Sequence, residues 1–212
     1  MEHVQDISEP PPTVIVVDDD ESVREALGGL FVSVGFRAEL CSSVEEMLDV
    51  ASTEGPSCLV LDVRLPSTNG LDAYAHLSSQ GLRTPVVFIT GHGSIPMSVR
   101  AMKAGAVDFL SKPVRDQDLL DAVGTALNRD ADRRRRDTAR NELVCLFDRL
   151  TPREREILRH VVAGRLNKQI AADLGLSEIT VKVHRGNLMR KTRSISVAEL
   201  VRNVQEFGLL PD

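Results

Sequence analysis

The chain lacks any long hydrophobic run. Of its 212 residues, 42% are hydrophobic and 27% are charged, but no apolar stretch reaches the ~18 residues that a membrane-spanning helix needs. The N-terminus, MEHVQDISEPPPT, also lacks the basic start and apolar segment of a signal peptide. We therefore expect a cytoplasmic protein with no membrane partner, in which the acidic, proline-rich residues 1–12 form a flexible tail.

Cysteine is scarce as well. The three cysteines, Cys41, Cys58 and Cys145, are far apart in the sequence and odd in number, and none lies in a CxxC or a Cys/His cluster. This pattern indicates neither a disulfide framework nor a zinc site. We expect three buried free thiols in a reducing cytosol.

The net charge of −5 conceals an asymmetry between the two halves of the chain. Residues 1–128 hold 19 acidic and 8 basic side chains, whereas residues 129–212 hold 12 acidic and 18 basic ones. A basic C-terminal part favours a nucleic-acid partner. The acidic part does not, but its carboxylates suit a cation.

The first half alternates short apolar runs with amphipathic helical patterns. Strands are predicted at TVIVVD, FRAEL, CLVLDV, PVVFIT and VDFL, and helices at 21–35, 43–52, 70–79, 95–105 and 116–128. Continuous apolar strands between such helices predict an α/β fold, a doubly wound five-stranded parallel sheet covered on both faces. The ligand crevice of such a sheet lies at the carboxyl ends of its strands, where the strand order reverses.

Acidic side chains end two of these strands. Asp18 and Asp19 follow the first strand, and Asp62 ends the third. These strands are neighbours at the crevice, so the carboxylates would repel one another unless a divalent cation neutralised them. Oxygen ligands favour Mg²⁺ (or Mn²⁺). Asp62 is the natural nucleophile, because a carboxylate can accept a phosphoryl group as an acyl phosphate. Asp20 is interpreted as a helix N-cap.

Two further polar residues are predicted to converge on Asp62. Lys112, after the fifth strand, can pair with a phosphate oxygen, and Thr90, ending the fourth, can donate its hydroxyl to the same group. A lone Asp at a strand end is usually structural. Three converging acids with a Thr and a Lys indicate a phosphoryl site.

The segments VVDDDES, VLDVRLPSTNG, FITGHG and AMKAGAVDFLSKP together resemble the receiver domain of bacterial response regulators, with a CheY-like fold over residues 13–128. The resemblance implies that Asp62 is phosphorylated. It implies that Asp19, Asp62 and the backbone carbonyl of Arg64 bind the metal, and that Asp18 supports the metal through water.

The same resemblance makes Thr90 and Phe109 the switch pair and Lys112 the phosphate partner, with a cis bond between Lys112 and the following proline. Arg64 and His92 flank the predicted phosphoryl site. Our hypothesis is that these two side chains control water access and hence the lifetime of the phosphorylated state.

The second half reads as helical throughout. Residues 129–149 contain no Gly or Pro and are rich in Arg and Ala, which predicts a helical linker. Its RRRR run fits either a solvated helix face, which is favoured, or a DNA contact. In residues 150–212, Thr151 and Glu154 form a capping box, and two short helices joined by Leu-Gly-Leu-Ser form a helix-turn-helix signature.

The segment LTPREREILRHVVAGRLNKQIAADLGLSEITVKVHRGNLMRK resembles the LuxR/NarL-type helix-turn-helix, and the whole chain is similar to FixJ-type two-component response regulators. We expect helix 178–192 to enter the major groove of double-stranded promoter DNA. The residues expected to face DNA are Thr180, Lys182, Val183, Arg185, Asn187 and Lys191. Lys168 and Gln169, opening the preceding helix, are expected to touch phosphate.

Two positions on the same helix are harder to assign. His184 is interpreted as a packing residue. Gly186 lies mid-helix, where Gly costs ~1 kcal/mol relative to Ala. Gly186 either permits a close backbone approach to DNA or leaves a base unread.

The resemblance implies a transcription regulator, not an enzyme. A sensor histidine kinase would phosphorylate the receiver, which would shift to a state that dimerises and binds DNA. A dimer would place two recognition helices on adjacent half-sites. By analogy, activation is favoured over repression, with RNA polymerase as a further partner. The residues expected near the face that changes, as a dimer interface, as a docking surface for the DNA-binding domain or as ordinary core, are Met97, Val99, Met102, Leu119 and Val123.

Three other functions fit parts of the sequence. A phosphatase or phosphotransferase using Asp62 would need a second acid two residues later, where Arg64 stands. A DNA-binding regulator that works without phosphorylation would not need the complete set of pocket residues. A ligand-sensing quorum regulator shares the C-terminal module, but not the receiver pattern.

Overall fold

A computed structural model of the chain describes residues 10–50 and 54–210, so most of the predicted tail lies outside the described residues. The chain divides into two units, with the division between Arg134 and Arg135. The predicted limits of the receiver, linker and helix-turn-helix domains, at 13–128, 129–149 and 150–212, stay predictions.

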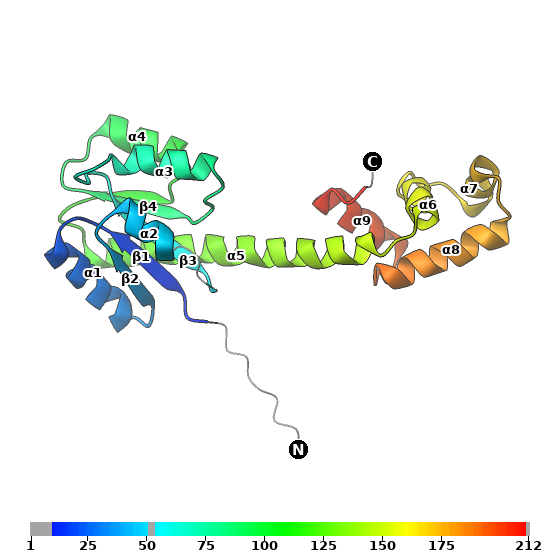
Figure 1. Ribbon diagram of the computed structural model, residues 1–212, viewed down its shortest axis with the longest axis horizontal. Coiled ribbons are helices and arrows are strands. Elements are labelled where there is room, and N and C mark those ends of the chain that lie inside the picture. The colour runs from blue at the N-terminus through cyan, green and yellow to red at the C-terminus, as the bar shows by residue number, and fades with distance from the viewer. Residues whose placement is uncertain (1–9, 51–53, 211–212) are drawn as a thin grey trace, which may run out of the picture. The chain divides into compact units, whose positions relative to one another are not determined.

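The first unit is built on the predicted five-stranded parallel sheet (Figure 1). Its strands are β1 Thr13–Val17, β2 Arg37–Cys41, β3 Ser57–Asp62, β4 Val86–Thr90 and β5 Asp108–Ser111. The strands are hydrogen-bonded in the order β2-β1-β3-β4-β5, and each neighbouring pair is parallel. The order reverses between β1 and β3, so the crevice lies at the carboxyl ends of these two strands.

Helices cover both faces of the sheet. They are α1 Glu21–Ser33, α2 Val44–Val50, α3 Gly70–Ser79, α4 Ile95–Lys103 and the start of α5 Asp116–Asp148. Successive strand residues point to opposite faces. In β1, Ile15 and Val17 therefore join the core under α2, α3 and α4, whereas Val14 and Val16 join the core under α1 and α5. Figure 1 shows α3 and α4 on one side of the sheet and α1 on the other.

The helix α5 unites two predicted segments, the helix at 116–128 and the linker, in one run of 33 residues. Leu119 and Val123 on α5 are buried against the sheet at 1% and 0% exposure, so they are core residues and cannot form an exposed interface. On α4, by contrast, Val99 and Met102 are exposed. Within the described residues, neither α5 nor any other helix is both long and apolar enough to cross a membrane.

A buried carboxylate ties α5 to the start of β3. Asp130 is 0% exposed and accepts hydrogen bonds from the Ser57 N–H (2.9 Å), Arg133 Nε (3.1 Å) and Arg134 Nε (2.7 Å). Burial alone would raise the pKa of Asp130, but these hydrogen bonds and the charge of Arg133 outweigh it and lower the pKa. The first two arginines of the RRRR run thus hold a buried acid, a role that the sequence did not indicate.

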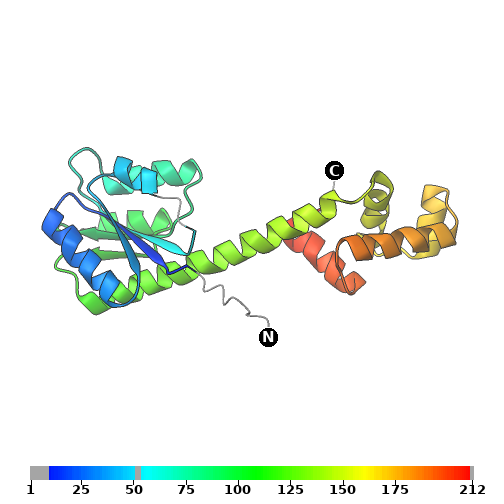
Figure 2. The same ribbon diagram turned by 60° about the horizontal axis from the view of Figure 1, so that its bottom comes forward.

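The second unit is helical. Its helices are α6 Pro152–Val162, α7 Asn167–Leu174, α8 Glu178–Lys191 and α9 Val197–Phe207, after the end of α5 (Figure 2). The predicted capping box of Thr151 and Glu154 begins α6. Gly175, at φ 64°, ends α7, and the Ser177 side chain caps α8 by accepting from the Thr180 N–H. The largest fully buried side chains of this core are Ile157, Leu158, Ile170, Leu188 and Leu200.

The three thiols differ in exposure. Cys41 and Cys58 are buried as predicted, but Cys145 on α5 is exposed, so the prediction for Cys145 was wrong. Burial raises the pKa of Cys41 to about 11 and raises that of Cys58 as well.

Candidate functional site

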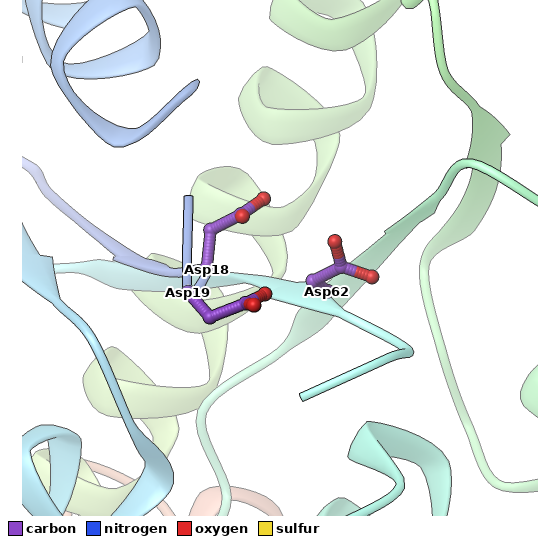
Figure 3. A group of neighbouring side chains, drawn as sticks. All are labelled: Asp18, Asp19 and Asp62. Atoms are coloured by element: carbon purple, nitrogen blue, oxygen red, sulfur yellow. The ribbon is translucent and has the colours of Figure 1, made fainter. Parts of the chain in front are cut away.

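Parallel pairing brings the predicted pocket residues to one edge of the sheet. Val17 pairs with Leu61, so the residues that follow them, Asp18 and Asp62, lie opposite each other at the strand ends. Figure 3 shows Asp18 and Asp19 leaving the end of β1 beside Asp62 at the end of β3.

The three carboxylates can share one cation. One oxygen each of Asp18, Asp19 and Asp62 lies within 4.8 Å of the others. Asp18 is 0% and Asp62 6% exposed, whereas Asp19 is exposed, so the cluster opens to solvent on one side. Hard oxygen donors at this spacing fit Mg²⁺. The Arg64 N–H donates to Asp62 Oδ1 at 2.8 Å. The role of the Arg64 carbonyl as a metal ligand stays a prediction.

Lys112 bridges the two buried acids. Its Nζ donates to Asp18 Oδ2 and to Asp62 Oδ2, each at 2.6 Å. Burial alone would lower the pKa of Lys112, but the hydrogen bonds to both carboxylates and their charges outweigh it and raise the pKa. For Asp18 burial dominates over the Lys112 hydrogen bond, and the pKa is raised. The bond between Lys112 and Pro113 is cis, as the resemblance implied.

Thr90 and Phe109 lie beneath a common loop. Thr90 is 0% exposed, and its Oγ1 accepts from the His92 N–H at 3.3 Å. A Cβ added to Gly93 would lie 2.8 Å from Ser111 Oγ, 3.2 Å from Phe109 Cε1 and 3.5 Å from Thr90 Cγ2. The loop after β4 therefore packs on both members of the predicted switch pair, and it does so through Gly93, which the sequence reasoning missed.

The backbone of Asp62 packs directly against Gly70. A Cβ at Gly70 would lie 2.2 Å from the Asp62 carbonyl oxygen, a separation that no side chain can adopt without movement of the backbone. The Gly70 N–H donates to the Val63 carbonyl at 2.8 Å, and Asn69 caps α3 by accepting from the Leu71 N–H. The Asn-Gly dipeptide in VLDVRLPSTNG was the signal for this close approach.

Two contacts hold the loop after β1, and the first of them was predicted. Asp20 is the N-cap of α1, as predicted, and accepts from the Ser22 and Val23 N–H groups at 2.9 and 3.3 Å. Arg24 Nη1 donates to the Asp18 carbonyl at 2.7 Å. The side chains of Arg64 and His92 are exposed near the pocket.

The residues predicted to contact DNA differ in exposure and in their hydrogen bonds within the protein. Lys168, Gln169, Lys182 and Val183 are exposed, Val183 at 57%, and Gln169 Oε1 also accepts from the Leu166 N–H at 2.9 Å. Thr180, Arg185 and Asn187 are half-buried. Within the described residues Arg185 Nη1 donates to Asn167 Oδ1 at 2.6 Å, and Asn187 Oδ1 accepts from Arg190 at 3.1 Å. His184 is half-buried, in agreement with a packing role.

Lys191 is hydrogen-bonded within the protein, and its contact with DNA stays a prediction. Its Nζ donates to Glu154 Oε2 at 2.7 Å and to the Arg149 carbonyl at 3.2 Å, so it anchors the end of α8 to the start of α6. The Glu154 side chain is only 4% exposed, which makes this a nearly buried ion pair. Ile179, which is 77% exposed, and Arg190, also exposed, belong to the solvent-facing surface of α8 and were not named among the predicted candidates. Their helical spacing from Val183 was the available signal.

Comparison with known proteins matches both halves of the chain. Residues 14–124 match the response regulator receiver domain, and residues 148–204 match the bacterial regulatory proteins of the luxR family. Nodulation protein W of Bradyrhizobium diazoefficiens is 51% identical over 190 residues, which cover 90% of this chain and 84% of that protein. Transcriptional regulatory protein FixJ of Azorhizobium caulinodans is 41% identical over 91% of each chain.

A solved structure is similar over nearly the whole chain. The low-resolution structure of the response regulator StyR is 45% identical, with a TM-score of 0.83, and the match covers 93% of this chain and 100% of that one.

Proposed function

Since the chain belongs to the two-component response regulators that join a receiver domain to a LuxR-type DNA-binding domain, we propose that Asp62 is the residue whose phosphorylation controls its DNA binding. The family works by phosphorylation-driven regulation of transcription and is not enzymatic. Its members take their phosphoryl group from a histidine kinase. Receiver domains bind Mg²⁺ at an acidic pocket of the kind formed here.

One observation carries the assignment of Asp62. Asp62 contacts Lys112 and keeps 6% of its surface exposed, whereas Asp18, which shares the Lys112 contact, is 0% exposed. A carboxylate oxygen of Asp62 attacks the phosphorus of a phosphohistidine, the O–P bond forms as the P–N bond breaks, and the imidazole leaves. Lys112 pairs with an oxygen of the transferred group.

The metal site makes this transfer favourable. Asp18, Asp19, Asp62 and the backbone carbonyl of Arg64 would hold Mg²⁺ (or Mn²⁺), which neutralises charge on the phosphoryl group. Asp18 is buried and Asp19 is exposed, so Asp19 provides the accessible side of the site.

The signal passes from the pocket through Thr90 and Phe109. Both side chains contact the loop around Gly93, so movement of Thr90 toward the phosphoryl group alters the space around Phe109. The adjacent helix α4 exposes Ile95 (81%), Val99 (47%) and Met102 (50%). This apolar face is proposed to form the dimer contact that phosphorylation promotes.

The output is binding of promoter DNA by α8 in the major groove. Lys182 and Val183 are its exposed base-reading candidates, with Lys168 and Gln169 on phosphate. The half-buried Thr180, Arg185 and Asn187 are proposed as secondary contacts. The dimer places two such helices on adjacent half-sites in the bacterial cytoplasm and activates transcription through RNA polymerase.

Treatment with acetyl phosphate and Mg²⁺ tests the proposal. Wild type and Asp72→Asn, which changes an exposed carboxylate on α3, should gain one phosphoryl group by intact mass, whereas Asp62→Asn should gain none. Phosphorylated wild type should sediment as a dimer and bind DNA more tightly. Equal labelling of Asp62→Asn would reject Asp62 as the acceptor. Unchanged sedimentation and DNA affinity in labelled wild type would reject the switch.

A further inference from the structure

Gly186 occupies the centre of the exposed face of α8. The buried face of this helix is formed by Val181 and Leu188, both 0% exposed. On the other side, Lys182, Val183, Gly186 and Arg190 are all exposed and follow one another at the spacing of neighbours on a helix surface. A side chain in the middle of this face would normally extend furthest toward a bound ligand.

Nothing in the described part of the chain requires glycine at this position. A helix-interior Gly is less stable than Ala, so its presence needs a reason. Among the described residues, no heavy atom outside its chain neighbours and the backbone of its own helix lies within 4 Å of a Cβ added to Gly186. Its backbone is helical and does not have the positive φ that favours glycine, as Gly175 does. Gly28 in α1 shows the contrast, because a Cβ there would lie 3.0 Å from Leu40.

We infer that Gly186 is the point at which the backbone of α8 lies closest to the DNA, and that the missing side chain sets how deeply the helix enters the major groove. The inference rests on the proposed role of α8 in DNA binding. Gly186 would then determine specificity because the absence of a side chain lets the helix approach the bases, and not because Gly186 itself contacts a base.

The dimensions of the groove support this reading. The major groove is about 12 Å wide, and a helix with its side chains is about 10–12 Å across. A side chain at the centre of the inserted face would therefore hold the helix axis away from the base edges. Hydrogen bonds to base edges require about 2.7–3.2 Å. Lys182 on one side of Gly186 and Arg190 on the other would then lie too far from the base edges to form these hydrogen bonds.

Open space alone does not carry the inference. Gly124 in α5 is also a helical glycine with no atom within 4 Å of an added Cβ in the described structure. Gly124 belongs to α5 in the first unit and is not part of the α8 face, so of these two glycines only Gly186 combines open space with the centre of the surface proposed to meet DNA. Gly124→Ala is therefore a matched control, because it makes the same chemical change in another helix.

The test uses full-length protein treated with acetyl phosphate and Mg²⁺. A duplex selected by the wild type from a randomised pool is the specific probe, and a scrambled duplex is the non-specific one. Gly186→Ala should raise the melting temperature of the helical unit by a few degrees. It should weaken binding to the selected duplex about tenfold, and Gly186→Leu should weaken it further. Binding to the scrambled duplex should change little, because non-specific binding depends on phosphate charge.

Gly124→Ala should bind both duplexes as the wild type does. The dependence of affinity on salt should be the same for Gly186→Ala and wild type, since no charge changes. If Gly186→Ala binds the selected duplex as tightly as wild type, or weakens on both duplexes equally, the inference is wrong.

Lys182→Ala separates this failure from failure of the proposed interface. If wild type selects no duplex, or Lys182→Ala binds as tightly as wild type, the proposed DNA-binding face is wrong and the inference fails with it. If Lys182→Ala weakens binding but Gly186→Ala does not, the interface stands and only the close approach at Gly186 is refuted.

Discussion

Replacing Asp130 by alanine is expected to destabilise the first unit by about 2–4 kcal/mol. The carboxylate is 0% exposed and is the acceptor for the N–H of Ser57, which is itself 1% exposed. Alanine leaves that buried N–H without this acceptor, at a cost of about 1–3 kcal/mol.

The arginines add the remainder of the effect. Breaking a fully buried ion pair costs about 3–5 kcal/mol. Arg133 and Arg134 are each 31% exposed, so water recovers much of this loss and the lower part of the range applies. Against a total stability of about 5–15 kcal/mol, the change is large.

Tyrosine fluorescence provides a clean assay. The chain has no tryptophan and one tyrosine, Tyr74 in α3, which packs edge-on against Phe88 at 5.8 Å. Urea titrations followed at Tyr74 therefore report on the first unit alone. Asp121→Ala is the control, because Asp121 is an exposed acid on the same helix whose side chain accepts from Gln117. We expect Asp121→Ala to lie within about 0.5 kcal/mol of wild type.

The pH dependence has a defined sign. The pKa of Asp130 is lowered from its ordinary value of 3.8, so its stabilising effect is fully present above that value and is lost as the pH falls through the lower folded-state pKa. The gap in unfolding free energy between wild type and Asp130→Ala should stay constant near neutral pH and shrink below about pH 4. A gap equal to that of Asp121→Ala, or one that widens in acid, would refute this account of the buried carboxylate.

Three further outcomes are expected. Gly70→Ala should lower both phosphorylation by acetyl phosphate and urea resistance, because its Cβ meets a carbonyl oxygen at 2.2 Å; normal labelling would contradict this. Lys191→Met should destabilise the helical unit by about 2–3 kcal/mol in thermal melts, since it leaves the 4%-exposed Glu154 without its cation; an unchanged melt with weaker DNA binding would restore Lys191 as a DNA contact. Arg64→Ala and His92→Ala should change the dephosphorylation rate, measured by loss of labelled protein over time; rates equal to wild type would reject their gating role.

The fold was predictable because its signals are local and repeated. Apolar strands such as TVIVV and CLVLD alternate with amphipathic helices, and this pattern alone requires a parallel sheet covered on both faces. Strand-end acids then had to meet at one edge. Asp18, Asp19 and Asp62 do so, because β1 and β3 are direct neighbours.

Contacts between distant segments were not predictable in the same way. Asp130 and Ser57 are 73 residues apart, and no spacing rule links them. The ion pair of Lys191 with Glu154, 37 residues earlier, was not predictable either. Leu119 and Val123 fitted either an interface or the core, and the packing of α5 against the sheet places them in the core.

The different exposure of the three thiols has a practical consequence for spectroscopy. Maleimide and iodoacetamide dyes react with accessible thiolates. Cys41 and Cys58 are enclosed and hard to ionise, whereas Cys145 lies on the surface of the helix that continues past the receiver. The unmodified sequence therefore accepts a fluorophore or spin label at one position, and changes at α5 on phosphorylation can be followed without engineering a cysteine-free background.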